Sequence, residues 1–295
     1  MIMRRSIHWL LGAMAMAGSL QARAEEAVTK KDGLMIVENI CYSEKAGGAG
    51  FGDLYLPAQP EKARPLLLIH GGAWKIMDRS RVKMVAEFLA RKGFAVFNID
   101  YRLIPQADYP ACELDCLAAA QFLLDGRHPA MKQLDLRSIV PLGLSAGGHL
   151  ALMTGLKLPP GQVAGIIDIS GPTDLASPEL RNLMKGSGMF KSQGGEEYES
   201  SLKAASPTVI ADKKTLPPLL VLNNQNDQIV PVQQAYKIME VWNKSQADLQ
   251  VFLWKGKPGM THDIWRNGNL NPDLHVMIER QITAFLETFF VKADQ

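Results

Sequence analysis

The sequence predicts an α/β protein built on one doubly wound, mostly parallel sheet. Short segments that are apolar throughout alternate with longer helical patterns along most of the 295 residues. Strands of this kind are typical of a parallel sheet that helices cover on both faces. In addition, 47% of the residues are hydrophobic and 21% are charged, which is enough to fill one large core.

The first elements predict an antiparallel start to this sheet. Residues 34–56 hold short strand patterns, and the glycine-rich segment 46–52 interrupts them as a hairpin connection would. Residues 65–70 then form a continuous apolar strand that ends in Gly71 and Gly72, and a helical pattern follows at about 81–92. The alternation of strand and helix begins here.

The remaining elements continue the alternation to the end of the chain. Strands are predicted at 94–99, 138–143, 163–169, 218–222 and 249–254, and helices at 111–124, 145–156, 232–244 and 272–291. We expect right-handed crossovers between the parallel strands. No internal repeat or linker divides the chain, so residues 25–295 are predicted to form one domain.

One connection, at about residues 170–217, is longer than strand connections usually are. It is polar and rich in glycine around residues 186–195. Long connections in compact domains are usually functional or disordered. We therefore expect a small cap inserted into the domain, with a surface loop of no particular role as the alternative.

The N-terminus carries the pattern of a signal peptide. Arg4 and Arg5 precede an apolar stretch at about 7–20, and Ala22-Arg23-Ala24 forms a small-x-small cleavage pattern. The stretch is shorter than the roughly 20 residues that a membrane-spanning helix needs. We expect cleavage after Ala24 and export to the periplasm or the medium, with no stable membrane insertion of the mature protein.

Charge and cysteine content narrow the range of partners. The formal net charge is +2, and no basic stripe or acidic tail stands out, so nucleic acid is a poor candidate. Cys41, Cys112 and Cys116 show no metal-ligand spacing, and no metal is predicted. A bridge between Cys112 and Cys116, one helical turn apart, would strain the helix, and we expect buried thiols.

The candidate nucleophile is Ser145, in the sequence Gly-Leu-Ser-Ala-Gly at 143–147. This motif follows a predicted strand and opens a predicted helix, which is the setting of a nucleophile elbow. A tight turn there exposes the serine hydroxyl. The helix N-terminus also places the Ala146 N–H where a developing oxyanion would lie.

A second glycine motif at 70–74, His-Gly-Gly-Ala-Trp, ends an earlier strand. Glycines let the backbone turn toward the nucleophile and offer further N–H donors. Gly71, Gly72 and Ala73 are therefore the predicted oxyanion loop, and Trp74 is predicted to contact substrate. We expect His70 to be a structural residue and not the base.

A serine nucleophile needs an imidazole to accept its proton and a carboxylate to orient that imidazole. In this type of site the chain order is serine, acid, histidine. His262 follows the last strand after a short loop, whereas His275 lies inside the terminal helix. His128 and His149 come before any suitable acid. His262 is the predicted base.

The predicted acid is Asp227. It follows the strand at 218–222, in a loop at the carboxyl end of the sheet and just before a helix. Two other carboxylates compete. Asp174 could equally cap a turn, and Asp263 is too close to His262 in sequence to reach its far ring nitrogen easily.

Together these motifs resemble a known group of enzymes. The segments 70–74, 100–103 (Asp-Tyr-Arg-Leu), 143–150 and 226–231 are similar to those of esterase/lipase-like α/β-hydrolases related to hormone-sensitive lipase. Within that group the chain most resembles compact carbohydrate esterases that remove acetyl or feruloyl groups, and also kynurenine formamidases. The chain departs from wider relatives at Ala73, where they carry a third glycine, and at Thr261 and Asp263 around the base.

The resemblance implies an α/β-hydrolase fold and a serine esterase that works through an acyl-enzyme and needs no cofactor. The expected substrate is a short-chain or carbohydrate-linked ester, either a small molecule or attached to a polysaccharide. Hydrolysis of a formyl amide with the same triad is the alternative. A non-catalytic binding protein on the same fold is the third hypothesis, and such proteins usually lack a triad member. The sequence leaves acyl length, the alcohol and the oligomeric state open.

Overall fold

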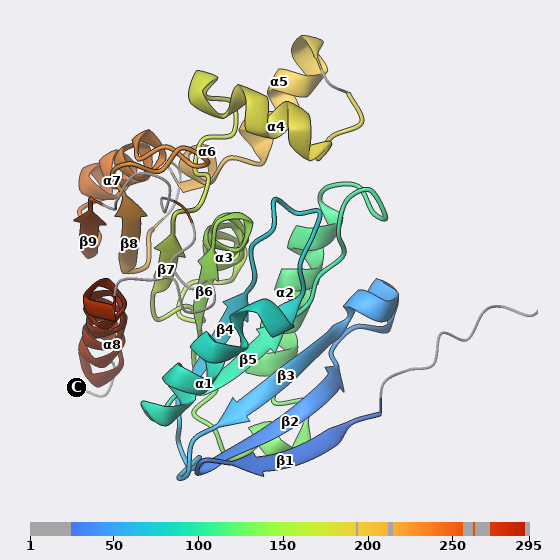
Figure 1. The fold of residues 1–295 in the computed structure, drawn as a ribbon, viewed down its shortest axis with the longest axis vertical. Coiled ribbons are helices and arrows are strands. Elements are labelled where there is room, and N and C mark those ends of the chain that lie inside the picture. Colours follow the sequence, from blue (N-terminus) through green and yellow to red (C-terminus); the bar gives the residue numbers. More distant parts are fainter. Residues whose placement is uncertain (1–24, 193, 212–214, 256–261, 263–271, 293–295) are drawn as a thin grey trace, which may run out of the picture.

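The computed structural model describes residues 25–192, 194–211, 215–255, 262 and 272–292. Within these residues the chain forms one nine-stranded sheet with helices on both faces (Figure 1). The predicted α/β class with a mostly parallel, doubly wound sheet is therefore confirmed. The predicted signal segment 1–24 lies outside the described residues.

The sheet starts antiparallel, as the sequence predicts. β1 (Ala27–Lys31), β2 (Leu34–Cys41) and β3 (Phe51–Leu56) pair in order, and β3 continues antiparallel onto β5 (Ala95–Ile99). β1 was not predicted, because all five of its side chains are exposed and no apolar alternation marks it. A 3-10 turn at Glu44–Ala49 fills the predicted hairpin connection.

The parallel part of the sheet reverses its winding beside β4 (Pro65–Ile69). β4 lies between β5 and β6 (Val140–Leu144), so the chain moves outward on one side of β4 and then on the other. β7 (Ile166–Ile169), β8 (Leu219–Asn224) and β9 (Leu249–Trp254) follow in order. Ligand sites in such sheets lie at the carboxyl ends of the strands, where the winding reverses.

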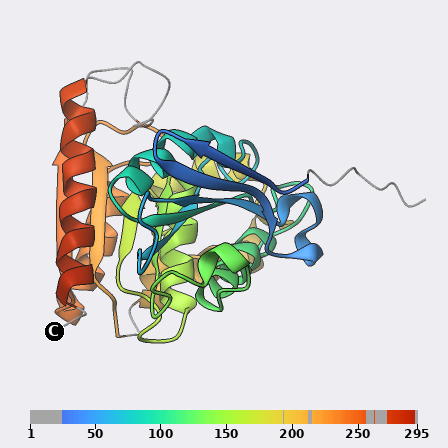
Figure 2. The same ribbon diagram turned by 90° about the horizontal axis from the view of Figure 1, so that it is seen from below.

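Helices cover both faces of the sheet, because the central strands are apolar on both sides and must be buried on both. In β4, Leu66 and Leu68 pack into the cluster beneath α1 and α8, whereas Leu67 and Ile69 face the cluster beneath the other helices. Figure 2 shows the long α8 beside the far edge of the sheet. The helices are α1 (Lys83–Arg91), α2 (Ala111–Leu124), α3 (Ala146–Lys157), α7 (Gln233–Ser245) and α8 (Pro272–Lys292).

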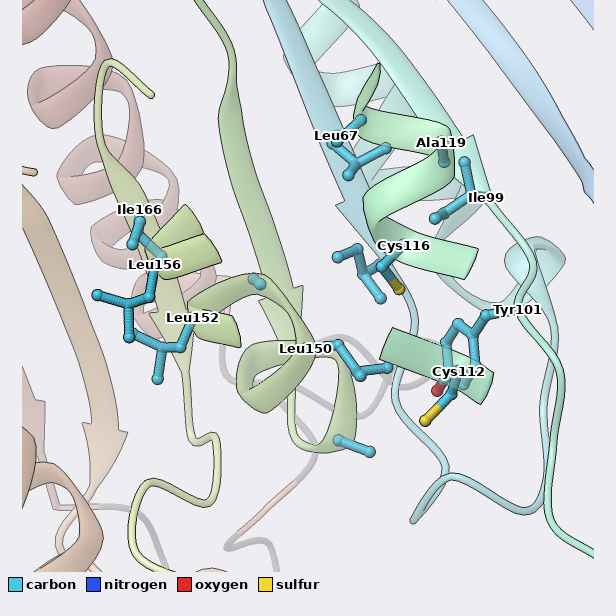
Figure 3. Close-up of a cluster of buried hydrophobic side chains, with 14 of the residues drawn as sticks. Leu67, Ile99, Tyr101, Cys112, Cys116, Ala119, Leu150, Leu152, Leu156 and Ile166 are labelled. Atoms are coloured by element: carbon cyan, nitrogen blue, oxygen red, sulfur yellow. The ribbon is translucent and has the colours of Figure 1, made fainter. Parts of the chain in front are cut away.

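Helix α3 is the central helix of the core. Every residue from Ala146 to Leu156 is buried, as expected of a helix with packed neighbours on all sides. Figure 3 shows Leu150 directed toward α2 and Leu156 beside Ile166 of β7. Cys112 on α2 is buried and free, as is Cys116, which confirms the expectation of buried thiols.

The segment 170–217 folds into short helices beyond the carboxyl ends of the parallel strands (Figure 1). They are α4 (Arg181–Ser187), α5 (Gly195–Ala204) and α6 (Pro207–Ala211). Their inner side chains, among them Met184 and Tyr198, are buried. We call this segment the insertion. Its described part is a packed unit and not a loose surface loop. Among the described helices, none has the length and apolar character to cross a bilayer.

Candidate active site

Ser145 lies on the sharp turn between β6 and α3. Its backbone has φ +58° and ψ −123°, a conformation that costs free energy in any residue other than glycine. The Ser145 N–H donates to the Ile169 carbonyl at 2.8 Å, which fixes the turn against β7. A Cβ at Gly143 would lie 2.1 Å from the Gly147 carbonyl oxygen, so the turn needs glycine there. The predicted elbow is present.

Glycines also let the end of β4 lie directly against this turn. The oxyanion loop begins where β4 ends. A Cβ at Gly147 would lie 2.1 Å from the Ile69 carbonyl oxygen, at the end of β4. A Cβ at Gly71 would lie 3.3 Å from the Cβ of Ser145. The loop after β4 therefore starts beside the nucleophile, as predicted, because both helix and loop approach without side chains between them.

The oxyanion loop folds into a tight turn. The Gly72 carbonyl accepts the N–H groups of Lys75 and Ile76 at 3.0 and 3.1 Å. Gly72 has φ +109°, and Ala73 and Trp74 have φ +52° and +61°. Two consecutive non-glycine residues in the left-handed region indicate a backbone that its surroundings hold in place.

Tyr101 is one of the groups that hold this loop. Its single hydroxyl proton is shared between the carbonyl oxygens of His70 and Gly71, which lie 3.0 and 3.2 Å from the hydroxyl oxygen. Its ring stacks on the His70 imidazole with centroids 4.3 Å apart. His70 is buried, its Nδ1 lies 2.7 Å from the Gly71 carbonyl oxygen, and burial lowers its pKa. His70 thus has the structural setting that the sequence predicted for it.

The prediction that Trp74 contacts substrate is wrong for its side chain. The indole is 0% exposed, and its Nε1–H donates to Nδ1 of His149 at 3.3 Å. The two rings meet edge to face at 5.3 Å. The left-handed backbone at Trp74 turns the side chain into the core. An aromatic residue beside the oxyanion glycines suggested a binding surface, but the sequence does not show which way it points.

The three predicted catalytic residues meet in the structure. Nε2 of His262 lies 2.8 Å from Oγ of Ser145, and Nδ1 of His262 lies 2.6 Å from Oδ2 of Asp227. The other carboxylate oxygen of Asp227 accepts the N–H groups of Ile229 and Val230, both at 2.9 Å. A carboxylate only accepts, so Nδ1 of the imidazole carries a proton and Nε2 is left to accept one from Ser145.

The competing carboxylates and histidines do not share this geometry. Asp174 pairs with Nζ of Lys237 at 2.9 Å, and Asp263 lies outside the described residues. Nδ1 of His128 accepts from the Ala130 N–H at 3.2 Å. His275 pairs with Glu279 along α8 at 3.1 Å.

The segment 100–102 anchors the loop after β5 through two ion pairs. Asp100 pairs with Arg79. Arg102 forms a fork with the carboxylate of Asp115 on α2, with a closest distance of 2.7 Å. These pairs fix the ends of the segment from which Tyr101 reaches the oxyanion loop.

One feature beneath the site was not predicted. Asp168 on β7 is buried and accepts the Gly171 N–H at 2.9 Å, and burial raises its pKa to about 7. A Cβ at Gly148 would lie 2.4 Å from this carboxylate. The glycine at position 148 indicates that another group approaches α3 closely, but the sequence does not show that this group is a carboxylate. In the part of the chain that the structure describes, no group of three or more potential ligands could hold a metal.

Comparison with known proteins gives the family. The model of the BD-FAE family matches residues 52–241, from β3 to α7, and this range includes Ser145 and Asp227. The chain belongs to the BD-FAE family. The predicted resemblance to esterase-type α/β-hydrolases is thereby confirmed.

Other proteins similar to this BD-FAE chain are named as esterases. It is 24% identical over 258 residues to the probable isoprenylcysteine alpha-carbonyl methylesterase ICMEL1 of Arabidopsis thaliana, covering 79% of this chain and 53% of that protein. It is 28% identical over 200 residues to esterase LipC of Mycobacterium tuberculosis, covering 61% of this chain and 49% of that protein. The chain thus spans about half the length of these two relatives. It also matches 7% of a non-reducing polyketide synthase of Aspergillus terreus.

Solved structures share the fold of this BD-FAE chain. Esterase B from Lactobacillus rhamnosis aligns with a TM-score of 0.74 and 20% identity over 90% of both chains. A truncated carbohydrate esterase from gut microbiota aligns with a TM-score of 0.70 and 21% identity, over 90% of this chain and 98% of the other. At these identities the likeness shows the α/β-hydrolase fold.

Proposed function

We propose that this chain is a serine carboxylic-ester hydrolase. One observation carries the proposal: a single imidazole, that of His262, lies 2.8 Å from the Ser145 hydroxyl and 2.6 Å from the Asp227 carboxylate. Together these groups form a nucleophile, its general base and the group that orients the base. The esterase names of the relatives agree with this chemistry.

The mechanism follows from the proton positions. As Oγ of Ser145 attacks the ester carbonyl, Nε2 of His262 accepts the hydroxyl proton and Asp227 stabilises the resulting imidazolium. His262 then donates that proton to the leaving alcohol, and an acyl-enzyme remains on Ser145. Water, deprotonated by the same imidazole, attacks the acyl group and releases the acid.

The oxyanion of each tetrahedral intermediate needs hydrogen-bond donors. The Ala146 N–H belongs to the first residue of α3, where backbone donors have no partner within the helix, and the helix dipole favours negative charge there. The turn that follows Gly71 begins beside Ser145, which supports the N–H groups of Gly72 and Ala73 as the donors on the other side. We assign these three groups to the oxyanion hole.

For the substrate we propose short-chain or carbohydrate-linked esters, with acetyl or feruloyl as the acyl group. Two observations support this class: the four sequence motifs resemble those of carbohydrate esterases, and a carbohydrate esterase is among the solved structures with this fold. The signal-peptide pattern of residues 1–24 supports a site of action outside the cytoplasm. Detection of the mature chain starting at Glu25 in the periplasm or the medium would test the export proposal.

The activity test compares three forms of the mature protein on p-nitrophenyl esters from acetate to dodecanoate, methyl ferulate, acetylated xylan and N-formylkynurenine. The wild type and Ser138→Ala, a change two residues before β6, are expected to hydrolyse acetate or ferulate esters at equal rates. Ser145→Ala is expected to be inactive. Equal rates for Ser145→Ala and wild type would refute the catalytic assignment, and turnover of the formyl amide alone would replace the esterase with an amidase.

A further inference from the structure

His149 is a buried polar residue for which the proposed mechanism has no role. It lies on α3, one turn after Ser145, and its side chain is 0% exposed. The backbone N–H of His149 donates to the Ser145 carbonyl at 3.1 Å. Its ring nitrogens contact two other parts of the site, and each contact is a hydrogen bond.

The first contact joins His149 to the oxyanion loop. The Trp74 Nε1–H donates to Nδ1 of His149 at 3.3 Å. Trp74 follows Ala73 directly, and both residues hold left-handed backbone conformations. A hydrogen bond that fixes the indole therefore restrains the peptide next to the N–H groups assigned to the oxyanion.

The second contact joins His149 to the insertion. Nε2 of His149 lies 2.8 Å from the carbonyl oxygen of Ala205, the residue directly after α5. A carbonyl only accepts, so Nε2 carries the proton and Nδ1 is the acceptor for Trp74. Burial also lowers the pKa of His149 to about 4, which keeps the ring neutral at neutral pH. One tautomer satisfies both neighbours.

The insertion also contacts the oxyanion loop directly. Nζ of Lys75, two residues after Ala73, donates to the Gly186 carbonyl at 3.1 Å. The Trp74 carbonyl in turn accepts the Ile104 N–H at 2.8 Å. The loop is thus held by the elbow helix, by the segment after β5 and by the insertion.

We propose that His149 is a positioning residue that fixes the oxyanion loop, by accepting from Trp74 while its other nitrogen is held by Ala205 of the insertion. The proposal rests on the proposed esterase function. It gives the insertion a part in catalysis that does not require it to move over the substrate. A misplaced oxyanion donor weakens binding of the transition state more than binding of the substrate.

The test measures kcat and KM on p-nitrophenyl acetate for Trp74→Phe, His149→Phe, the double variant and His149→Asn. Loss of an entire oxyanion donor costs about 10² to 10³ in kcat, and we expect displacement to cost about tenfold or more, with little change in KM. The double variant should lose no more than His149→Phe, because both changes break one link. His149→Asn keeps an acceptor near the position of Nδ1 but loses the bond to Ala205, and should recover part of the lost kcat.

The control for a loosened core is Leu152→Ala, on the same helix but outside this link. It is expected to lower the unfolding temperature while leaving kcat unchanged below that temperature. Trp74→Phe keeps the bond between His149 and Ala205, so it serves if His149→Phe does not fold. Wild-type kcat in Trp74→Phe and His149→Phe, or an equal loss in Leu152→Ala, would overturn the proposal. Failure of the proposed function is distinct, because Ser145→Ala would then match the wild type.

Discussion

Replacement of Asp227 by Asn tests the electrostatic arrangement of the site with almost no change of shape. The Asp227 side chain is buried, and one oxygen accepts two backbone N–H groups while the other lies 2.6 Å from Nδ1 of His262. In Asp227→Asn the amide oxygen keeps the two backbone donors. The amide NH2 then faces Nδ1 of His262, where the carboxylate oxygen was.

Two donors cannot face each other, so the imidazole must change its tautomer. Nδ1 becomes the acceptor and Nε2 takes the proton, and Nε2 can then no longer accept one from Ser145. In hydrolases with this triad a wrong tautomer lowers kcat by about 10⁴. At about 1.4 kcal/mol per factor of ten, this equals about 5 kcal/mol of activation free energy.

The assay follows release of p-nitrophenolate from the acetate ester at pH 7.5 for the wild type, Asp227→Asn and Asp174→Asn. The control, Asp174→Asn, removes the competing acid. Its ion pair with Lys237 is partly exposed, so loss of the pair is expected to change kcat by no more than about twofold. Asp227→Asn should unfold at nearly the wild-type temperature, because its backbone hydrogen bonds persist. If Asp174→Asn lost activity and Asp227→Asn kept it, the assignment of the acid would be refuted.

Two further predictions concern the glycines and the buried carboxylate around α3. Gly147→Ala places a Cβ 2.1 Å from the Ile69 carbonyl oxygen. We expect this change to cost about 1 to 3 kcal/mol of stability in a urea titration and most of the activity in the esterase assay. Gly186→Ala is the control, because its Cβ meets nothing within 4 Å, and it should change neither the stability nor the activity. Burial raises the pKa of Asp168 from 3.8 to about 7, so the folded state keeps a proton that the unfolded state releases, and the contribution of Asp168 to the free energy of unfolding should fall as pH rises between these two values and level off above them. Burial of His149, which lowers its pKa to about 4, acts in the opposite direction. The test is therefore the difference in free energy of unfolding between the wild type and Asp168→Asn in urea titrations from pH 4.5 to 8: this difference should fall as pH rises, and a constant difference would refute the assignment.

Local patterns determined most of the fold. α2 occupies the predicted residues 111–124, and β9 the predicted 249–254. Both have an apolar pattern whose period or continuity depends only on neighbours in the chain. β1 could not be predicted in this way. Its side chains are exposed, and it is a strand because β2 offers its backbone hydrogen bonds.

The candidate triad was also predictable, since chain order and element ends restrict it. Ser145, Asp227 and His262 each follow a strand of one parallel sheet, and the carboxyl ends of such strands share an edge. The direction of a side chain is different, because it depends on the backbone dihedrals. Trp74 was expected at the substrate and lies in the core, turned there by its left-handed backbone.

By itself, the sequence determined the parallel strands, the elbow and the candidate triad of Ser145, Asp227 and His262, because repeating patterns and chain order are local properties. Only the tertiary structure decided that His149 joins Trp74 to Ala205 and that Asp168 lies buried against Gly148. These contacts join residues far apart in the chain or side chains of different elements. No local pattern encodes them, because they exist only once the sheet and the insertion have packed around α3.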